Sequence, residues 1–229
     1  MTNLAALVEY DGTRFKGFQR QAADQGPTVQ GAIEAVLARI AGEAISIEAA
    51  GRTDTGVHAS GQVINFHTAA HHAPATWGRA LNALLPEDIA IRAVRVAPDD
   101  FRARHSALSR RYGYRILCAP TRAPLRERYV WRVPARLDVA AMDAAAKHLL
   151  GTHDFGAFGT SPRDRRATGE RGHTVRTLCV ARCQLGDRAG DQEGAADEIV
   201  CEFTANAFLT GMVRRLVGTL VLVGRGQLA

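Results

Sequence analysis

The sequence predicts an α+β protein built from two similar subdomains, each with the order β-α-β-β-α-β. Segments with the alternating apolar pattern of strands are interleaved with segments of helical spacing, and this order of segments occurs twice. At 229 residues the chain is also long enough for two modest domains. We expect the boundary within residues 102–109, which gives subdomains of residues 1–105 and 106–229.

In the first subdomain, cap and stop residues delimit the expected helices. Thr28 is suited to cap a helix in which Val29, Ile33 and Val36 lie on one face, and Pro86 is suited to end the second helix because proline cannot continue one. We expect strands at residues 4–10, 45–50, 62–67 and 89–96 and helices at residues 28–40 and 75–85.

The second subdomain repeats this order but stops one element early. We expect strands at residues 109–118, 174–185 and 198–204 and helices at residues 139–150 and 208–223. The chain ends where the last strand should follow. Either a sheet edge is open, which would need a cover such as a dimer partner, or the protein is a variant that manages without that strand.

The charge of the chain favours a polyanionic partner. The net charge is +6, the isoelectric point is about 9.6, and all but two of the 29 basic residues are arginine. The planar guanidinium group donates two parallel hydrogen bonds to phosphate and can stack on bases. An arginine-rich genome could explain the ratio of arginine to lysine, but not the positions where arginine clusters.

The remaining composition favours a cytoplasmic protein without a metal. No stretch is long and apolar enough to span a bilayer, and the first residues lack the basic and apolar regions of a signal peptide. Four cysteines lie in strand-like segments, where we expect reduced, buried thiols: Cys118, Cys179, Cys183 and Cys201. They lack zinc-site spacing, and His67 and His71 have no glutamate in the usual place between them.

One aspartate stands out as a reactive group. Asp54 lies in a turn-prone run, residues 51–59, between two strand-like segments, with Arg52 two positions before it. A neighbouring positive charge favours the ionised carboxylate, which can act as a nucleophile or as an electrostatic stabiliser. On these residues alone, a glycosidase, a protease and a structural ion pair all remain open.

A basic loop follows the first strand. Residues 10–21 combine glycines and aromatic residues with Arg14, Lys16, Gln19 and Arg20. Such a loop can bind phosphates and stack on bases. The alternative is a solvated loop whose Phe15 and Phe18 pack in the core.

The first strand of the second subdomain carries another basic and aromatic cluster. Alternation over residues 110–115 places Tyr112 and Tyr114 on one face and the flanking arginines, Arg110, Arg111 and Arg115, on the other. One face could stack a base, although tyrosines are also common packing residues in strands.

The last helix carries Arg214 next to its apolar stripe, so we expect this guanidinium to be partly buried and to need an anion. Asp54 is one candidate. Display of Arg214 at the surface is an alternative, and pairing with Glu198 or Glu202 is a third.

Taken together, these segments resemble the tRNA pseudouridine synthases of the TruA type. The run from Gly51 to Ala59 is highly specific, whereas the other matches would mean little separately. The matching pieces span nearly the whole chain in the expected order: residues 9–12, 17–21, 28–31, 51–59, 81–82, 85–86, 101–107, 111–112, 114, 153–155, 174–177 and 206–218.

The resemblance implies isomerisation of uridine to pseudouridine at positions 38, 39 and 40 of the tRNA anticodon stem-loop, without metal or cofactor. Asp54 matches the catalytic nucleophile, and Tyr112 the tyrosine that stacks on the target base. Arg52 and Arg214 match the arginines around the aspartate. The resemblance further implies a homodimer and a continuous, mostly antiparallel sheet, with helices on one face and an RNA-binding cleft on the other.

The chemistry agrees with this assignment. Uracil is a poor leaving group, so breaking its glycosidic bond calls for a carboxylate, as in sugar hydrolysis. The base must also leave its helix, and the freed base must be held away from water.

One departure from the family lies in the last helix, where Thr210 and Gly211 stand in place of the usual histidine. Two other functions remain as alternatives. One is a tRNA-binding module that has lost catalysis. The other is an aspartic protease, whose signature Asp54-Thr55-Gly56 shares, although Arg52 would upset the shared proton of such a site.

Overall fold

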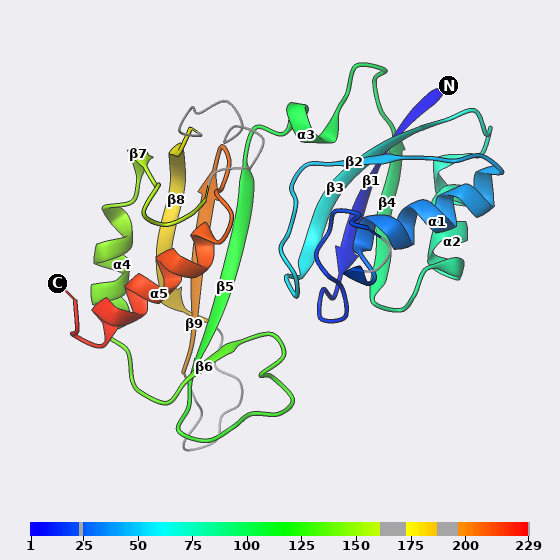
Figure 1. Ribbon diagram of the computed structural model, residues 1–229. Helices are drawn as coiled ribbons and strands as arrows, with labels where there is room; N and C mark the ends of the chain where they lie inside the picture. Colours follow the sequence, from blue (N-terminus) through cyan, green and yellow to red (C-terminus); the bar gives the residue numbers. More distant parts are fainter. Residues whose placement is uncertain (23–24, 161–172, 187–196, 229) are drawn as a thin grey trace. The chain divides into compact units, whose positions relative to one another are not determined.

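The computed structural model describes residues 1–22, 25–160, 173–186 and 197–228 (Figure 1). The chain divides into two compact units, Met1–Leu108 and Ser109–Ala229, each with its own apolar core. No helix in these described stretches is both long enough and apolar enough to cross a lipid bilayer.

The first unit has the predicted order β-α-β-β-α-β, followed by one short helix that the sequence did not indicate. Its elements are β1 Thr2–Tyr10, α1 Val29–Ala41, β2 Ile47–Ala49, β3 Ala59–Thr68, α2 Pro74–Leu84, β4 Ile89–Val96 and α3 Ala103–Ser106. The strands form an antiparallel sheet in the order β2-β3-β1-β4.

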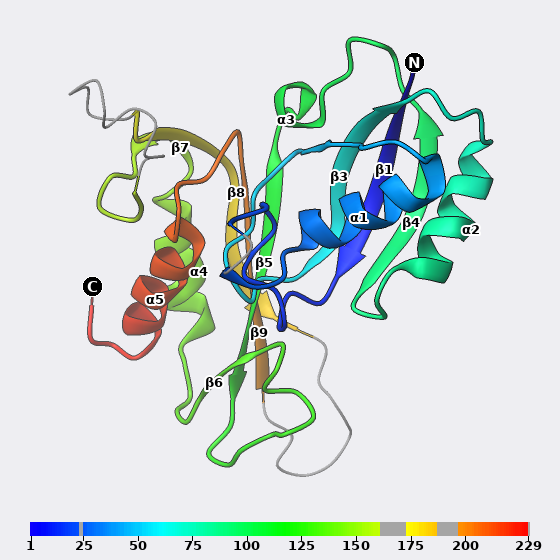
Figure 2. The same ribbon diagram turned by 45° about the vertical axis from the view of Figure 1, so that its right-hand side comes forward.

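Helices α1 and α2 cover one face of this sheet (Figure 2). Alternation along β1 sends Leu4, Ala6 and Val8 into the core beneath the helices, whereas Leu7 and Glu9 point to the other face and are exposed. The period-two pattern of the sequence thus decides which face of the sheet the helices cover.

The predicted helix boundaries follow from cap chemistry. The Thr28 hydroxyl accepts a hydrogen bond from the backbone N–H of Gly31, which confirms Thr28 as the N-cap of α1. Helix α2 has a proline in its first turn and ends at Leu84, two residues before Pro86.

A buried amide pair fixes the segment after β4. The Asn3 side chain donates to the carbonyl oxygens of Pro98 and Phe101, at 2.7 and 2.9 Å. The Asn65 side chain donates to Asn3 Oδ1 at 3.2 Å and accepts from the Ala103 backbone N–H at 2.8 Å. These bonds anchor α3 against the sheet through side chains that a propensity argument would assign to turns.

The second unit contains two short strands that the sequence did not indicate, β6 and β7. Its elements are β5 Arg110–Cys118, β6 Trp131–Val133, α4 Val139–Lys147, β7 Gly151–Asp154, β8 Val175–Leu185, β9 Asp197–Ala205 and α5 Met212–Gly224. Both helices are shorter than predicted. Helix α4 ends at Lys147, ahead of Gly151, which has a φ of 95°. Helix α5 starts only after Gly211, which has a φ of 74°, and both values are left-handed conformations that suit glycine.

These strands form a sheet in the order β6-β5-β9-β8-β7, antiparallel except for the pairing of β5 with β6. Helices α4 and α5 cover one face of it (Figure 2). Strand β6 takes the place beside β5 that β4 takes beside β1, and pairs over Ile116–Cys118. The edge where we expected a missing strand is therefore covered in part by this short strand.

The expectation of one continuous sheet is not met. In the described parts of the chain, hydrogen bonding forms two sheets, one in each unit. Strand β4 pairs with β1, and β5 pairs with β6 and β9.

The prediction of four buried thiols is wrong for Cys179. Cys183 and Cys201 face each other across β8 and β9 and are buried, and Cys118 is half-buried. Cys179 is exposed because the register of β8 shifts between Leu178 and Val180, which turns this side chain outward. The hydrogen bond with the Cys201 thiol, followed by burial, raises the pKa of the Cys183 thiol, which keeps it protonated.

The core of the second unit predicts the effect of truncating leucines on α5. Leu216 is 1% exposed and Leu222 is 43% exposed. We expect Leu216→Ala to lower the free energy of unfolding by about 2–5 kcal/mol, since it leaves a cavity, and Leu222→Ala by at most about 0.5 kcal/mol. Urea denaturation measures both, and equal losses would contradict the burial described for this helix.

Candidate active site

Asp54 lies in the loop between β2 and β3, which we call the aspartate loop (residues 50–58). The backbone N–H of Val57 donates to the Asp54 carbonyl at 3.2 Å and closes a turn, and Gly56 has a φ of 75°. Asp54 is half-buried and Arg52 is exposed. The loop therefore presents a carboxylate from a turn whose backbone conformation is set by glycine.

The aspartate loop packs directly on the loop after β1, which we call the basic loop (residues 11–21). The Phe18 N–H donates to the Thr53 carbonyl at 3.0 Å, and the Gly56 N–H donates to the Phe15 carbonyl at 3.4 Å. These two bonds lie on either side of Asp54 in the sequence. They tie its backbone to a second segment of the same unit.

Two glycines in the basic loop allow this close approach. A Cβ atom at Gly12 would lie 2.1 Å from the carbonyl oxygen of Val57. A Cβ atom at Gly17 would lie 2.9 Å from the carbonyl oxygen of Thr53, and Gly17 also has a φ of 93°. Any side chain at these positions would push the aspartate loop away.

Side chains reinforce the contact between the two loops. The Tyr10 hydroxyl and the Thr53 hydroxyl are 2.8 Å apart. His58 Nδ1 lies 3.0 Å from Asp11 Oδ1, and the Gln62 side chain donates to the carbonyl of Gly51. The start, the centre and the end of the aspartate loop are each held by a polar contact.

The structure decides between the two interpretations of the basic loop for its phenylalanines. Phe15 and Phe18 are 5% and 2% exposed and belong to the core of the first unit, so they are packing residues. The polar side chains of this loop are displayed instead. The four residues of this loop that were predicted to bind RNA are all exposed: Arg14, Lys16, Gln19 and Arg20.

Two of these four residues already have acidic partners. Arg14 Nε donates to Asp88 Oδ2 at 2.7 Å, and Arg20 Nη1 lies 3.2 Å from Glu34 Oε2. Glu34 is buried and also accepts from the backbone N–H of Ile47 in β2. Arg20 therefore connects the basic loop to α1 and β2 through a single carboxylate.

In the second unit, Tyr112 lies on the sheet face that the helices cover. Its ring meets that of Phe208 edge to face, with centroids 4.9 Å apart. Tyr112 is paired with Phe203, which is buried in the core. Tyr112 and Tyr114 share one face and Arg111 and Arg115 the other, as the alternation predicts, but Arg110 falls on the tyrosine side.

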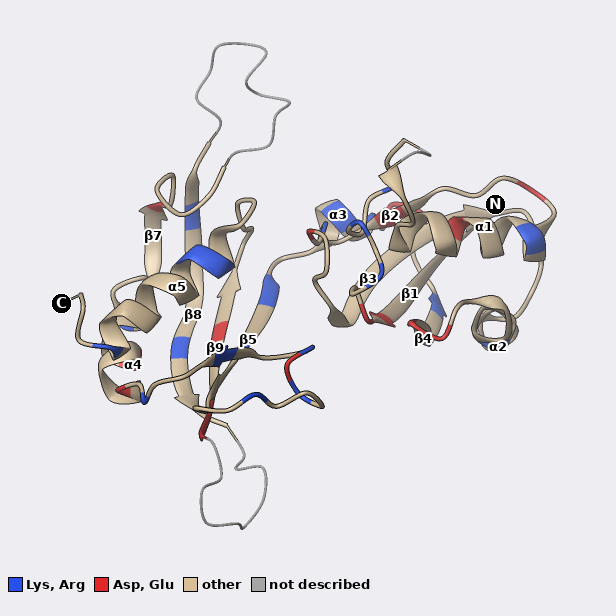
Figure 3. Ribbon diagram, turned by 60° about the horizontal axis from the view of Figure 1, so that its bottom comes forward, with Lys and Arg blue, Asp and Glu red and all other residues tan. Residues whose placement is uncertain are grey.

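Tyr112 therefore does not lie on the face opposite the helices, where the resemblance implied an RNA-binding cleft. The basic residues of the open face form a network with glutamates, and Figure 3 shows basic segments on β5 and β8 beside an acidic segment on β9. Glu202 accepts from Arg111 and from Arg182, the latter at 2.6 Å from Nε. These bonds lower the pKa of Glu202, and the bond from Arg111 has the largest effect.

Arg214 is exposed in the first turn of α5, which corrects the expectation that it is partly buried. Burial raises the pKa of Tyr114, and the positive charge of Arg214 lowers it by less, so Arg214 acts on the tyrosine side of the sheet. Glu198 and Glu202 point to the opposite face and are bound by other arginines. Pairing of Arg214 with either glutamate is therefore excluded.

Gly211, where the resemblance led us to expect a histidine, does not leave a poorly packed helix start. It serves as the N-cap residue of α5 in a left-handed conformation, and the neighbouring Leu209 and Met212 are 4% and 0% exposed. Arg110 lies near this segment, since its Nη1 donates to the carbonyl of Asn206 at 2.9 Å.

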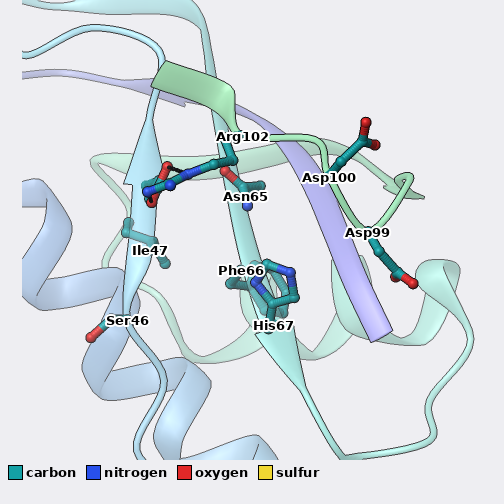
Figure 4. Close-up of a pocket in the computed structure, with 9 residues that line it drawn as sticks. Ser46, Ile47, Asn65, Phe66, His67, Asp99, Asp100 and Arg102 are labelled. Carbon is teal, nitrogen blue, oxygen red and sulfur yellow. Dashed lines mark hydrogen bonds and ion pairs between the residues drawn. The ribbon is translucent and has the colours of Figure 1, made fainter. Parts of the chain in front are cut away.

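A pocket of about 350 Å³ lies in the first unit, and no residue of the aspartate loop lines it (Figure 4). Its walls come from β2, β3 and the segment after β4, including Asn65, His67 and Arg102. The bond from Arg102 to Glu48 crosses this region and lowers the pKa of Glu48. None of the residues predicted to act on a substrate lines this pocket.

Comparison with known proteins identifies the chain's family. The sequence profile of the family described as tRNA pseudouridine synthase matches residues 6–106 and 145–229, which is most of the chain. The chain belongs to the tRNA pseudouridine synthase family. The predicted enzyme class, an isomerase, is thereby confirmed, and Asp54, Arg52 and Arg214 all fall within the matched residues.

Full-length relatives agree with this membership. The chain is 44% identical over 228 residues to tRNA pseudouridine synthase A of Roseiflexus sp. (strain RS-1), covering 100% of this chain and 79% of the relative. It is 46% identical over 229 residues to the protein of that name from Chloroflexus aurantiacus (strain J-10-fl), covering 100% and 77%. It is also 46% identical over 230 residues to tRNA pseudouridine synthase A of Methylobacterium nodulans, covering 100% of this chain and 84% of the relative.

Sequence reasoning placed Asp11 and His58 in the family's motifs but gave neither a role. They lie 47 positions apart, and only the packing of one loop on the other brings their side chains into contact. The signal in the sequence was a pair of nearby glycines, Gly12 directly after Asp11 and Gly56 two residues before His58, because glycine marks a close backbone approach or a positive φ.

The contact between the loops predicts the effect of adding one methyl group. Gly12→Ala should displace the aspartate loop, so the amides of Phe18 and Gly56 should exchange with solvent faster than in the parent enzyme. Gly78→Ala is the matched control, since the nearest atom to its Cβ would be 3.8 Å away. Hydrogen exchange measures both, and unchanged protection in Gly12→Ala would contradict the packing.

Proposed function

We propose that this enzyme isomerises uridine to pseudouridine in the anticodon stem-loop of tRNA, at positions 38, 39 and 40, with Asp54 as the nucleophile. The observation that supports this proposal most is the geometry of the aspartate loop. Its carboxylate is presented from a turn held by backbone hydrogen bonds to a neighbouring loop. The relatives' printed name, tRNA pseudouridine synthase A, supports the substrate class.

The reaction needs a group that first displaces the base from the sugar carbon C1′ and is then displaced by the base in turn. In our proposal the Asp54 carboxylate attacks the sugar carbon C1′ and the bond from C1′ to N1 of uracil breaks. The base turns, its C5 bonds to C1′ as the carboxylate leaves, and the C5 proton departs while N1 takes one up. Atoms balance between uridine and pseudouridine, and Asp54 is regenerated.

Three further residues have roles in this proposal. Tyr112 stacks on the target base and assists loss of the C5 proton, and its contact with Phe208 fixes the plane of the ring. Arg52, which is exposed next to the aspartate, supports the flipped nucleotide. Arg214 is the second arginine that the resemblance assigns to catalysis.

The basic residues bind the tRNA backbone in two ways. Lys16 and Gln19 are displayed by the basic loop, and Arg110 is held by a backbone carbonyl. Arg14, Arg20 and Arg111 are held in place by carboxylates, so phosphate would use the donors left over. We further propose that the enzyme acts as a homodimer in which one tRNA contacts both subunits.

Replacing the nucleophile tests the proposal most directly. The parent enzyme should convert uridine in unmodified tRNA, and Asp54→Asn and Asp54→Ala should convert none while they still bind tRNA, because only the attacking oxygen is lost. Mapping of pseudouridine along the tRNA measures this. Asp100→Asn, which changes an exposed carboxylate of the same unit, should leave conversion unchanged.

Each contrary outcome selects another explanation. Pseudouridine formation by Asp54→Ala would disprove the nucleophile assignment. Binding of tRNA without any conversion by the parent enzyme would favour a binding module that has lost catalysis. Cleavage of a peptide substrate would favour the protease.

Binding of tRNA should also weaken steeply as salt is added. Each phosphate contact releases condensed counterions, so the logarithm of the association constant should fall linearly with the logarithm of the salt concentration. Lys16→Gln should reduce the slope by about one contact and weaken binding of all tRNAs alike. Filter binding over a salt series measures the slope, and a flat response would contradict docking by basic residues.

A further inference from the structure

The ring nitrogen Nδ1 of His58 has two neighbours that require different hydrogen positions. The backbone N–H of Gly12 points at this nitrogen from 3.2 Å, which requires a bare Nδ1 that accepts. The Asp11 carboxylate oxygen Oδ1 also lies 3.0 Å from this nitrogen, a separation at which the two atoms attract each other only if Nδ1 carries a proton. One nitrogen cannot do both, so the proton on His58 decides which contact forms.

The carboxylate of Asp11 is held in place independently of His58. The same oxygen, Oδ1, accepts from the backbone N–H of Thr13 at 2.9 Å and from the Thr13 hydroxyl. An ionised carboxylate can only accept, and its hydrogen bond with an imidazole N–H is stronger than that from a neutral amide to a ring nitrogen. Asp11 therefore favours the form of His58 that carries its proton on Nδ1.

His58 stands at the end of the turn that presents the nucleophile. The preceding residue, Val57, closes this turn with its N–H on the Asp54 carbonyl, and the Val57 carbonyl is the atom in close approach to Gly12. A His58 ring held by Asp11 therefore fixes the end of the aspartate loop that packs closely against Gly12. The ring is about one third exposed and Asp11 about one fifth, so neither group is a core residue.

We propose that His58 is a positioning residue for Asp54, which acts by donating from Nδ1 to Asp11 and so holds the aspartate loop against the basic loop. The inference deepens the proposed function and rests on it for its effect on catalysis. The contact between His58 and Asp11 can be tested without catalysis.

Two amide variants separate positioning from general packing. The side-chain nitrogen of Asn reaches the place of Nδ1, whereas that of Gln reaches farther, toward the place of Nε2. We expect His58→Asn to keep kcat within about threefold of the parent enzyme, and His58→Gln to lower kcat about 100-fold with KM changed less than about twofold, because a misplaced nucleophile slows chemistry more than binding. His71→Asn, at an exposed histidine of the same unit, should change neither parameter.

The activity results have clear contrary outcomes. Equal losses in His58→Asn and His58→Gln, or a loss confined to KM, would overturn the positioning role. Thermal unfolding of each variant shows whether the fold is kept. If His58→Gln unfolds, the comparison of His58→Asn with the parent enzyme still applies, and a large loss of kcat in folded His58→Asn would overturn the proposal.

The tautomer of His58 can be measured directly in the full chain. In the ¹⁵N spectrum of histidine-labelled protein, with the His58 signals assigned by their absence in His58→Asn, Nδ1 should carry a proton, and Asp11→Ala should move the proton to Nε2. A bare Nδ1 in the parent protein would overturn the proposal. Failure of the parent enzyme to make pseudouridine would instead disprove the proposed function, while this spectrum would still decide the contact.

Discussion

The packing of the aspartate loop on the basic loop is the constraint on which the site in the first unit depends. Neither loop has regular secondary structure at the contact, so their backbone groups satisfy each other. The N–H of Phe18 donates to the carbonyl of Thr53, and the N–H of Gly56 donates to the carbonyl of Phe15. Gly12 and Gly17 are required because carbonyl oxygens of the facing loop occupy the space of their side chains. A carboxylate at Asp54 is thereby presented from a backbone that has little freedom to move.

The same arrangement separates the buried apolar side chains of the basic loop from its exposed polar side chains. Phe15 and Phe18 anchor it in the core, which leaves Lys16 and Gln19, the residues beside them, exposed. In the second unit, β5 divides its side chains in the same way. The ring of Tyr112 lies on the helix-covered face against Phe208, while Arg111 lies on the open face and is held by Glu202. Charged groups held by carboxylates have fewer conformations to lose when a ligand binds.

Much of this fold follows from local patterns in the sequence. Alternation predicted β1 and β5 and the faces that their side chains occupy, and the cap at Thr28 predicted the start of α1. The errors occurred where long-range contacts decide the outcome. Strand β6 has three residues and exists through its pairing with β5, and α3 is anchored by amides 38 or more positions away in β1 and β3.

The site was predictable in part for the same reason. The run around Asp54 is specific enough to predict a reactive carboxylate, because an arginine and a glycine turn accompany it within a few residues. The exposure of Arg214 depends on where α5 begins, which Gly211 sets by its left-handed conformation. The contact between Asp11 and His58 depends on the meeting of two loops, and no local pattern contains that information.

A double-mutant cycle on the rate of pseudouridine formation tests the central claim, that the packing of the two loops on each other fixes Asp54. Gly12→Ala and His58→Gln disturb this contact from opposite sides. If both act through the position of Asp54, the double variant should be about as slow as the slower single variant, because the loop is displaced only once. Losses that multiply in the double variant would show independent effects and contradict the account.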